Sequence, residues 1–305
     1  MPEVQSPDSG CSAAAAPLSA ARLRLDLLLS DRGACTGLIL IAAVAAIALL
    51  APFIAGDPTA QSITHALQSP SAEHWFGTDE FGRDVFSRVI YGARPALFVG
   101  LLSVLVSLAI GVPLGMLAGF RGGWFDTAVS GAVDVMLSFP ALLLALMIVA
   151  LVGSSLSVLV LAIGVAHVPI FVRLARSSTL LIRELDYVAA SRSFGASERH
   201  ILLRHIFPNI LGPLIVMATL SIGGAIREEA ALSFLGLGVQ PPNPSWGNLI
   251  RDGVTTILEA PWLALLPGLC LTVSVLAFNV LGDAVRDILD PRDLAASALK
   301  KRKAK

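Results

Sequence analysis

The sequence predicts an all-α polytopic membrane protein with about six membrane-spanning helices. Of its 305 residues, 55% are apolar and only 14% are charged, whereas a soluble domain is about 45–50% apolar and about 25% charged. Six long apolar runs follow one another, and about 20 residues suffice for a crossing. Arginine and lysine gather in alternate connections between the runs, which is typical of multi-pass proteins. An ordinary soluble enzyme, a nucleic-acid binder and a disordered regulator are therefore disfavoured.

The apolar runs give the expected helices in order. The first begins near Cys35 and ends near Ile54, which is too long for the apolar part of a cleaved signal peptide. The other five cover about 95–120, 127–152, 156–172, 210–231 and 262–280. The third and fourth are separated by Gly153, Ser154 and Ser155 alone, so we expect a tight turn there.

Placement of the positive charges orients these helices. With the N-terminus inside, the inner segments hold seventeen of the 22 Lys and Arg residues and the outer loops hold four. Because positive residues favour the cytoplasmic side, both termini are expected inside. The domain organisation is then a cytoplasmic arm 1–33, a membrane domain 34–285 and a cytoplasmic tail 286–305. Within the membrane domain we expect outer loops at about 57–94 and 234–261 and a cytoplasmic coupling loop at about 173–208.

The scarce charges also argue against catalysis by this chain. Its lysines are Lys300, Lys301, Lys303 and Lys305, so no glycine-rich phosphate loop with its lysine is present in the sequence. The three cysteines and five histidines show no metal-ligand spacing, and no nucleophile, base and orienting residue can be grouped. We therefore expect no enzyme activity, no metal site and no cofactor bound by the chain itself.

The cytoplasmic loop carries a helix–turn–helix pattern. Gly195 follows helix-favouring residues and suits the left-handed position past a helix end. Ser197 can cap a second short helix, with Glu198 in its first turn, and Pro208 is expected to end that helix. A solvated loop seldom mixes apolar and basic residues around a glycine turn, so docking of a partner is favoured. The candidate docking residues are Tyr187, Ala189, Ala190, Ser191, Phe194, Gly195, Ala196, Ser197 and Pro208.

This loop resembles the EAA loop of bacterial ATP-binding-cassette importer permeases. Gly195 and the pair Phe207-Pro208 fall at the family's spacing, while Ala189 stands at the position of the family's glutamate. Three further segments, in the right order, resemble signatures of the dipeptide, oligopeptide and nickel permeases: 74–88, 232–247 and 278–291. Together they resemble the C-type permease subunit of these importers.

The resemblance implies a type I importer permease fold that forms half of a translocation channel for short peptides across the bacterial inner (plasma) membrane. It implies a second homologous permease, two ATPase subunits that bind ATP and Mg, and a periplasmic or lipid-anchored solute-binding protein. One alternative is a permease for nickel or another small solute in the same family. An ion-gradient-driven secondary transporter is the alternative from a different class, with Asp134 and Glu229 as its support.

Several residues keep two interpretations at this stage. The outer-loop signature Gly77, Thr78, Asp79, Gly82, Arg83 and Asp84 is either a capped turn before a helix through Val85 or a rim that meets the binding protein. Asp134 and Glu229 either make structural pairs or line the translocation pathway, because ionisable groups within a span seldom face lipid. Arg227 and Glu228 depart from the family's apolar or small residues. Gly111, Gly115 and Gly119 allow close helix packing, within the chain or against a partner.

Overall fold

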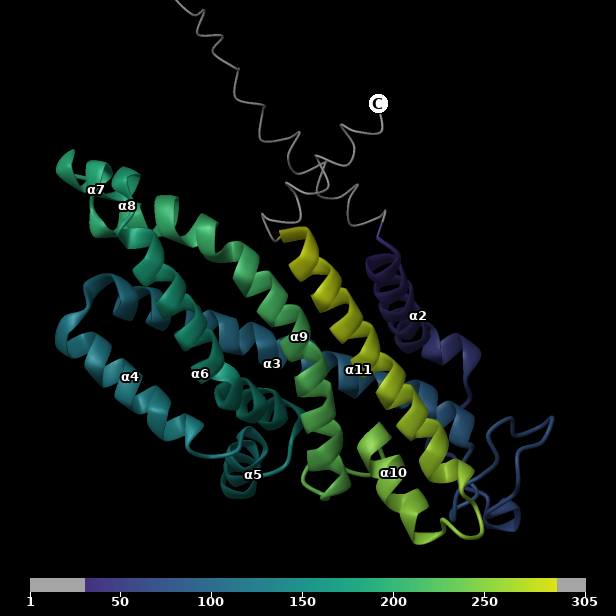
Figure 1. Ribbon diagram of the computed structural model, residues 1–305. Helices are drawn as coiled ribbons and strands as arrows, with labels where there is room; N and C mark the ends of the chain where they lie inside the picture. Colours follow the sequence, from purple (N-terminus) through teal and green to yellow (C-terminus); the bar gives the residue numbers. More distant parts are fainter. Residues whose placement is uncertain (1–30, 290–305) are drawn as a thin grey trace, which may run out of the picture.

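Long apolar helices make up most of the computed structural model, which describes residues 31–289 (Figure 1). Five of them are long and apolar enough to cross a membrane, and a bent pair of shorter helices can provide a sixth crossing. The five are α2 (Arg32–Ile54), α3 (Val85–Arg121), α6 (Leu156–Arg183), α9 (Phe207–Phe234) and α11 (Trp262–Leu289). The bent pair is α4 (Gly123–Leu137) and α5 (Ala141–Val152). The predicted fold class, all-α with about six spans, is confirmed.

Short helices mark the two ends of the bundle. At one end lie α7 (Asp186–Ser193) and α8 (Glu198–Ile201), and at the other lies α10 (Trp246–Thr255). The start of α2 and the end of α11 are both at the end that carries α7 (Figure 1). We call these the α7 end and the α10 end. A single 3-10 turn (Ile63–His65) lies in the long α2–α3 connection, which is also at the α10 end.

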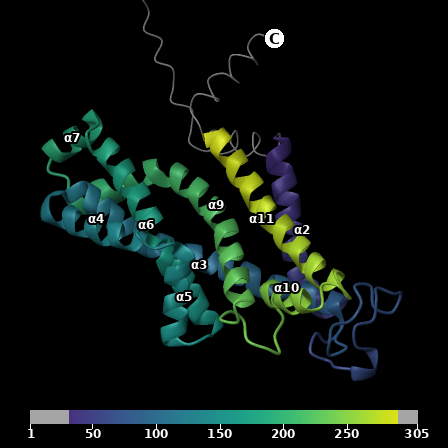
Figure 2. The same ribbon diagram turned by 60° about the horizontal axis from the view of Figure 1, so that its bottom comes forward.

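Helices α6 and α9 both pack against α3. In both views α4, α6 and α9 follow one another from left to right; α3 runs behind them in Figure 1 and below α6 and α9 in Figure 2. Large apolar side chains from these helices, among them Leu159, Ile163 and Phe171, are fully buried in the main core. Helix α2 packs beside α11 on the far side of the bundle from α4.

The glycines of α3 provide its close approach to α6. A Cβ atom added at Gly115 would lie 2.4 Å from the carbonyl oxygen of Val172. At Gly119 it would lie 2.7 Å from the carbonyl oxygen of Arg176. Ser107 on the same face donates a 2.7 Å hydrogen bond to the carbonyl oxygen of Gly164. The small-residue spacing therefore serves packing within the chain, the first of the two interpretations.

The third predicted span is not one straight helix. A continuous crossing was expected over 127–152, but α4 ends at Leu137, α5 begins at Ala141, and the two axes differ by 88°. Pro140 explains the break, because it lacks an N–H and its ring clashes with the carbonyl four residues back. A proline also disfavours the helical region for the residue before it, here Phe139, and Ser138 donates its hydroxyl to the carbonyl oxygen of Val135.

The expected helix end at Pro208 is also wrong. The chain passes from α8 through one wide π-helical turn (Leu202–Ile206) directly into α9, with Pro208 in the first turn of α9. The N–H of Phe207 donates to the carbonyl oxygen of Leu202, five residues back. The π turn shifts the hydrogen-bond register from four to five residues just before Pro208. The helix can therefore continue past the proline.

Helix bounds also differ from the apolar runs at two other places. Helix α6 continues to Arg183, so the first third of the predicted loop 173–208 is helical. Helix α3 begins at Val85, with Asp84 accepting a 2.8 Å hydrogen bond from the N–H of Ser87, as the predicted capped turn requires. The tight turn at Gly153 is confirmed, with Ser155 capping α6. Most of the predicted arm 1–33 and tail 286–305 lies outside the described residues.

Candidate functional site

The predicted docking loop forms one protruding unit at the α7 end. Helix α7 ends at Ser193, and Gly195 just beyond it has a φ of +80°, in the left-handed region. Ser197 then caps α8 by accepting a hydrogen bond from the N–H of His200. Both local predictions are confirmed. Phe194 is at the tip of this unit with 91% of its surface exposed. We call α7, the turn and α8 the docking unit; it brings together Tyr187, Ala189, Ala190, Ser191, Phe194, Gly195, Ala196 and Ser197, whereas Pro208 is on α9.

A small set of contacts holds α7 on the start of α9. Val188 is the single α7 residue that is fully buried, and it packs in the core with residues of α8 and the π turn. The hydroxyl of Ser191 is 3.2 Å from Nε2 of His205, and the ring of Tyr187 is 5.8 Å from the ring of the same histidine. Most of the α7 surface is therefore free for a partner, while its inner edge is fixed.

Three contacts connect this region of the protein to α3. Nε of Arg121, at the end of α3, is 2.7 Å from Oε1 of Glu198 in α8. The guanidinium of Arg192 in α7 lies over the ring of Phe120. At the end of α6, Nη1 of Arg183 donates a 2.6 Å hydrogen bond to the carbonyl oxygen of Gly119. A force applied to α7 therefore reaches α3 as well as α9.

The outer-loop signature folds the α2–α3 connection against itself. Gly77 and Gly82 both have positive φ, and a Cβ at Gly82 would lie 1.8 Å from the carbonyl oxygen of Ser62. Thr78 is fully buried; its hydroxyl donates to the carbonyl oxygen of His65 and accepts a 2.9 Å hydrogen bond from the N–H of Gln68. These contacts give the residues a structural role in the loop.

Asp79 is the centre of a buried charge cluster in the same loop. One carboxylate oxygen is 2.7 Å from Nε of Arg83 and 3.5 Å from Nε of Arg88, and the other accepts the backbone N–H groups of Phe81 and Arg83. Both arginines and the aspartate are buried. Such a cluster is stable only while complete, because removing one member leaves an uncompensated buried charge.

The two predicted pathway acids have different surroundings and different partners. Glu229 on α9 is fully buried; Oε1 accepts a 2.7 Å hydrogen bond from the hydroxyl of Ser233, and Oε2 has no partner among the described residues. Asp134 on α4 is exposed and pairs at 2.6 Å with Nη2 of Arg173 on α6. The structure therefore does not bring the two acids together.

Glu228, the second of the two departures from the family, lies beside α6. Oε2 of Glu228 is 3.6 Å from Nδ1 of His167, whose ring nitrogen also lies 3.0 Å from the carbonyl oxygen of Ile163. Arg227 is exposed on the same turn of α9. Sequence reasoning did not connect His167 with Glu228, because the two residues are far apart in the chain.

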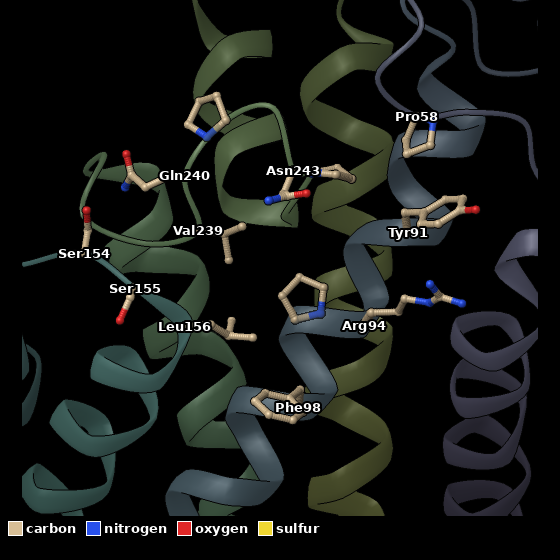
Figure 3. A pocket seen from close by; sticks show the side chains of 13 residues that line it. Pro58, Tyr91, Arg94, Phe98, Ser154, Ser155, Leu156, Val239, Gln240 and Asn243 are labelled. Atoms are coloured by element: carbon tan, nitrogen blue, oxygen red, sulfur yellow. The ribbon is translucent and has the colours of Figure 1, made fainter.

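A hollow at the α10 end was also missed by sequence reasoning. It has a volume of about 690 Å³ and lies between α3, the α5–α6 turn and the loop before α10 (Figure 3). Tyr91 and Phe98 line its α3 wall, and Gln240 and Asn243 provide polar groups from the loop. Arg94 points away toward α2, where its Nε donates a 2.7 Å hydrogen bond to the carbonyl oxygen of Ala48.

Comparison with known protein families agrees with this architecture. The profile of the family described as "Binding-protein-dependent transport system inner membrane component" matches residues 111–293. A second profile, "N-terminal TM domain of oligopeptide transport permease C", matches residues 22–70. The chain belongs to this family of binding-protein-dependent inner-membrane transport components. The predicted family resemblance and the inner-membrane location are thereby confirmed.

Named relatives of this transport component cover most of both chains. It is 46% identical to the dipeptide transport system permease protein DppC of Alkalihalophilus pseudofirmus, over 87% of this chain and 88% of the relative. It is 44% identical to the glutathione transport system permease protein GsiD of Pectobacterium atrosepticum, over 74% and 75%. It is 42% identical to the probable D,D-dipeptide transport system permease protein DdpC of Escherichia coli K12, over 84% and 87%.

A solved structure shares the fold of this transport component. Inward-facing structures of the MetNI methionine ABC transporter match it with a TM-score of 0.56 and 20% sequence identity. The match covers 67% of this chain and 96% of the other. This confirms the predicted fold of a type I importer permease.

Proposed function

We propose that this chain forms half of the translocation channel of an ATP-driven importer for short peptides in the bacterial inner membrane. The family membership supports transport that depends on a solute-binding protein. The named relatives support peptides as the substrate class, because dipeptides, D,D-dipeptides and glutathione are all short peptides. The proposed partners are a second homologous permease, two ATPase subunits that carry ATP and Mg, and a periplasmic or lipid-anchored binding protein.

The observation that carries the ATP-driven part is the docking unit. It exposes most of α7 and Phe194, the residue directly after α7, and it is held by one buried valine and a few polar contacts. An exposed aromatic side chain at the tip of a rigid helix is an effective anchor in a partner's pocket. We place the α7 end in the cytosol, with both termini, because the excess of arginine and lysine lies on that side.

The proposed mechanism uses α7 as a lever. Because α8 continues through the π turn into α9, displacement of α7 by the ATPases moves the whole of α9. The Arg121–Glu198 pair carries part of the same displacement to α3. These are the helices that pack on α6, so their motion alters the interior face of the bundle. Backbone hydrogen bonds inside each helix stay satisfied during such a rigid movement.

The α10 end is the proposed entry side for substrate. There the hollow between α3, the α5–α6 turn and the loop before α10 offers apolar walls with a few neutral polar groups. The buried cluster of Asp79 with Arg83 and Arg88 fixes the conformation of the adjacent outer loop, which is the proposed contact surface for the binding protein. Glu229 is buried on α9 near this end, and its role in the pathway is part of the proposal.

The energy source is tested by uptake into sealed vesicles that contain this chain with its partner permease, two ATPase subunits and a binding protein. With ATP supplied on the ATPase side, peptide uptake is expected to persist after a protonophore collapses the proton gradient. Loss of uptake under these conditions would favour the gradient-driven class of transporter and overturn the proposal. Vesicles without ATP are the matched control.

A further inference from the structure

The pair Asp134–Arg173 places charge on an exposed helix face, well inside both α4 and α6. Arg173 is ten residues before the end of α6, and Asp134 is eleven residues after the start of α4. At about 1.5 Å per residue both are about 15 Å along their helices from the α7 end. Helix α6 has 28 residues and is longer than the hydrocarbon thickness of about 30 Å, so Arg173 lies toward the α7 side of this span. The two side chains are 60% and 63% exposed.

A lipid-facing position does not suit such a pair. Charged side chains inside a span seldom face lipid, so these residues are expected to face the protein interior or water. Figure 1 shows α4, α6 and α9 side by side on the face of the bundle away from α3. We therefore take this open face, and not an outer lipid-facing one, as the wall of the translocation pathway.

A groove between α4 and α6 surrounds the pair. Its volume is about 660 Å³, within the range of small-ligand sites, and its lining includes the hydroxyl groups of Ser130 and Ser177 as well as the two charges. The groove therefore offers Arg173, Asp134 and two neutral side chains together, beside Arg176, whose guanidinium is held by Asp126.

The ion pair Arg176–Asp126, beside the same groove, is a structural pair with which Arg173–Asp134 can be compared. Arg176 contacts both carboxylate oxygens of Asp126 through two different nitrogens, and the two side chains are only 33% and 18% exposed. Arg173 makes a single contact with Asp134, in the open. Exposed single-contact pairs contribute about 0–1 kcal/mol, so a ligand can take over either partner at little cost.

We propose that Asp134 and Arg173 form a transit site for zwitterionic peptides on the way to the cytosol. The peptide's ammonium group binds the carboxylate of Asp134, and its terminal carboxylate binds the guanidinium of Arg173. Both peptide charges lose water on entering the membrane, and the site compensates them at this depth. This inference rests on the proposed function for its substrate class, but the test below measures binding without transport.

The experiment protects a cysteine placed in the groove. Ser177→Cys is introduced into a chain whose native cysteines are replaced by alanine, within the complete transporter, and a charged maleimide is applied from the α7 side. The probe ligand is dialanine. At about twice its Kd it should slow labelling roughly threefold, since occupancy reduces the free site by 1 + [L]/Kd. Dialanine with an acetylated amino end and an amidated carboxyl end should give no protection.

Variants separate charge recognition from simple crowding. Asp134→Asn and Arg173→Gln should each abolish protection by dialanine while the labelling rate without peptide stays unchanged, which shows that the groove is intact. Arg121→Gln, which removes an exposed arginine at the end of α3, should keep the protection. Equal protection by capped and free dialanine, protection that survives in both groove variants, or absence of labelling because another subunit covers the groove would each overturn the proposal.

Uptake measured on the same wild-type vesicles separates the proposed transit site from the proposed importer function. ATP-dependent uptake of dialanine without protection of the cysteine would reject the transit site and leave the importer function standing. Protection without ATP-dependent uptake would support the site and reject the importer function.

Discussion

Replacement of Gly195 by valine tests the docking unit through a single backbone angle. Gly195 has φ of +80°, and a Cβ built there meets no atom within 4 Å, so the change introduces no clash. The cost comes from holding an L-residue in the left-handed region, which is about 1–2 kcal/mol. This corresponds to a roughly 5–30-fold fall in the population of the native turn. Because Val188 is the one fully buried residue of α7, the turn can rearrange without unfolding the bundle.

We therefore expect Gly195→Val to insert normally, to lose most peptide uptake and to retain ATP hydrolysis by the complex. The assay is uptake and ATPase activity measured on the same vesicles. Gly195→Asn should retain much more uptake, since asparagine tolerates the left-handed region.

Gly123→Val is the matched control. Gly123 also has a positive φ, +61°, and also meets no atom within 4 Å, but it is the first residue of α4. Unchanged uptake in Gly195→Val, or an equal loss in Gly123→Val, would refute the reasoning that the α7 turn couples ATP hydrolysis to transport.

Three further predictions concern packing and charge. Gly115→Ala places a Cβ 2.4 Å from a carbonyl oxygen and should lower stability by about 1–3 kcal/mol in thermal unfolding, whereas Gly131→Ala, with open space around it, should not. Asp79→Asn leaves two buried arginines without their carboxylate and should lower the free energy of unfolding by about 3–5 kcal/mol in the same measurement. A decrease of less than about 1 kcal/mol would contradict this prediction. Glu198→Gln removes an exposed pair and should change stability by less than about 1 kcal/mol.

The parts of the fold that were predictable depend on short-range signals. The left-handed turn at Gly195 and the caps at Ser197 and Asp84 follow from residues a few positions apart. The packing of α3 on α6 was visible in the four-residue spacing of glycines, although the partner helix was not. In each case one residue type has a conformational or steric property that others lack.

The parts that were missed are of two kinds. Some are helix breaks or helix ends that hydropathy does not register, and others are contacts between residues far apart in the sequence. The run 127–152 is apolar enough to hide the break at Pro140, and hydropathy does not register a change of helix direction. The apolar run that ended at Val172 placed Arg173 in a loop, although α6 continues to Arg183. Its pairing with Asp134, 39 residues away, follows from helix packing, which the sequence does not reveal.

The most direct test of the account is where an ATPase subunit touches this chain. Phe194→Cys is prepared in a chain without native cysteines, and a short thiol-to-amine cross-linker is applied to the assembled transporter. Trp75→Cys is the control, because Trp75 is also an exposed aromatic residue, 64% against 91%, but lies in the loop at the α10 end. The account predicts cross-linking to an ATPase subunit from position 194 and none from position 75. Cross-linking of position 75 to an ATPase subunit, or no cross-linking of position 194 to one, would contradict it.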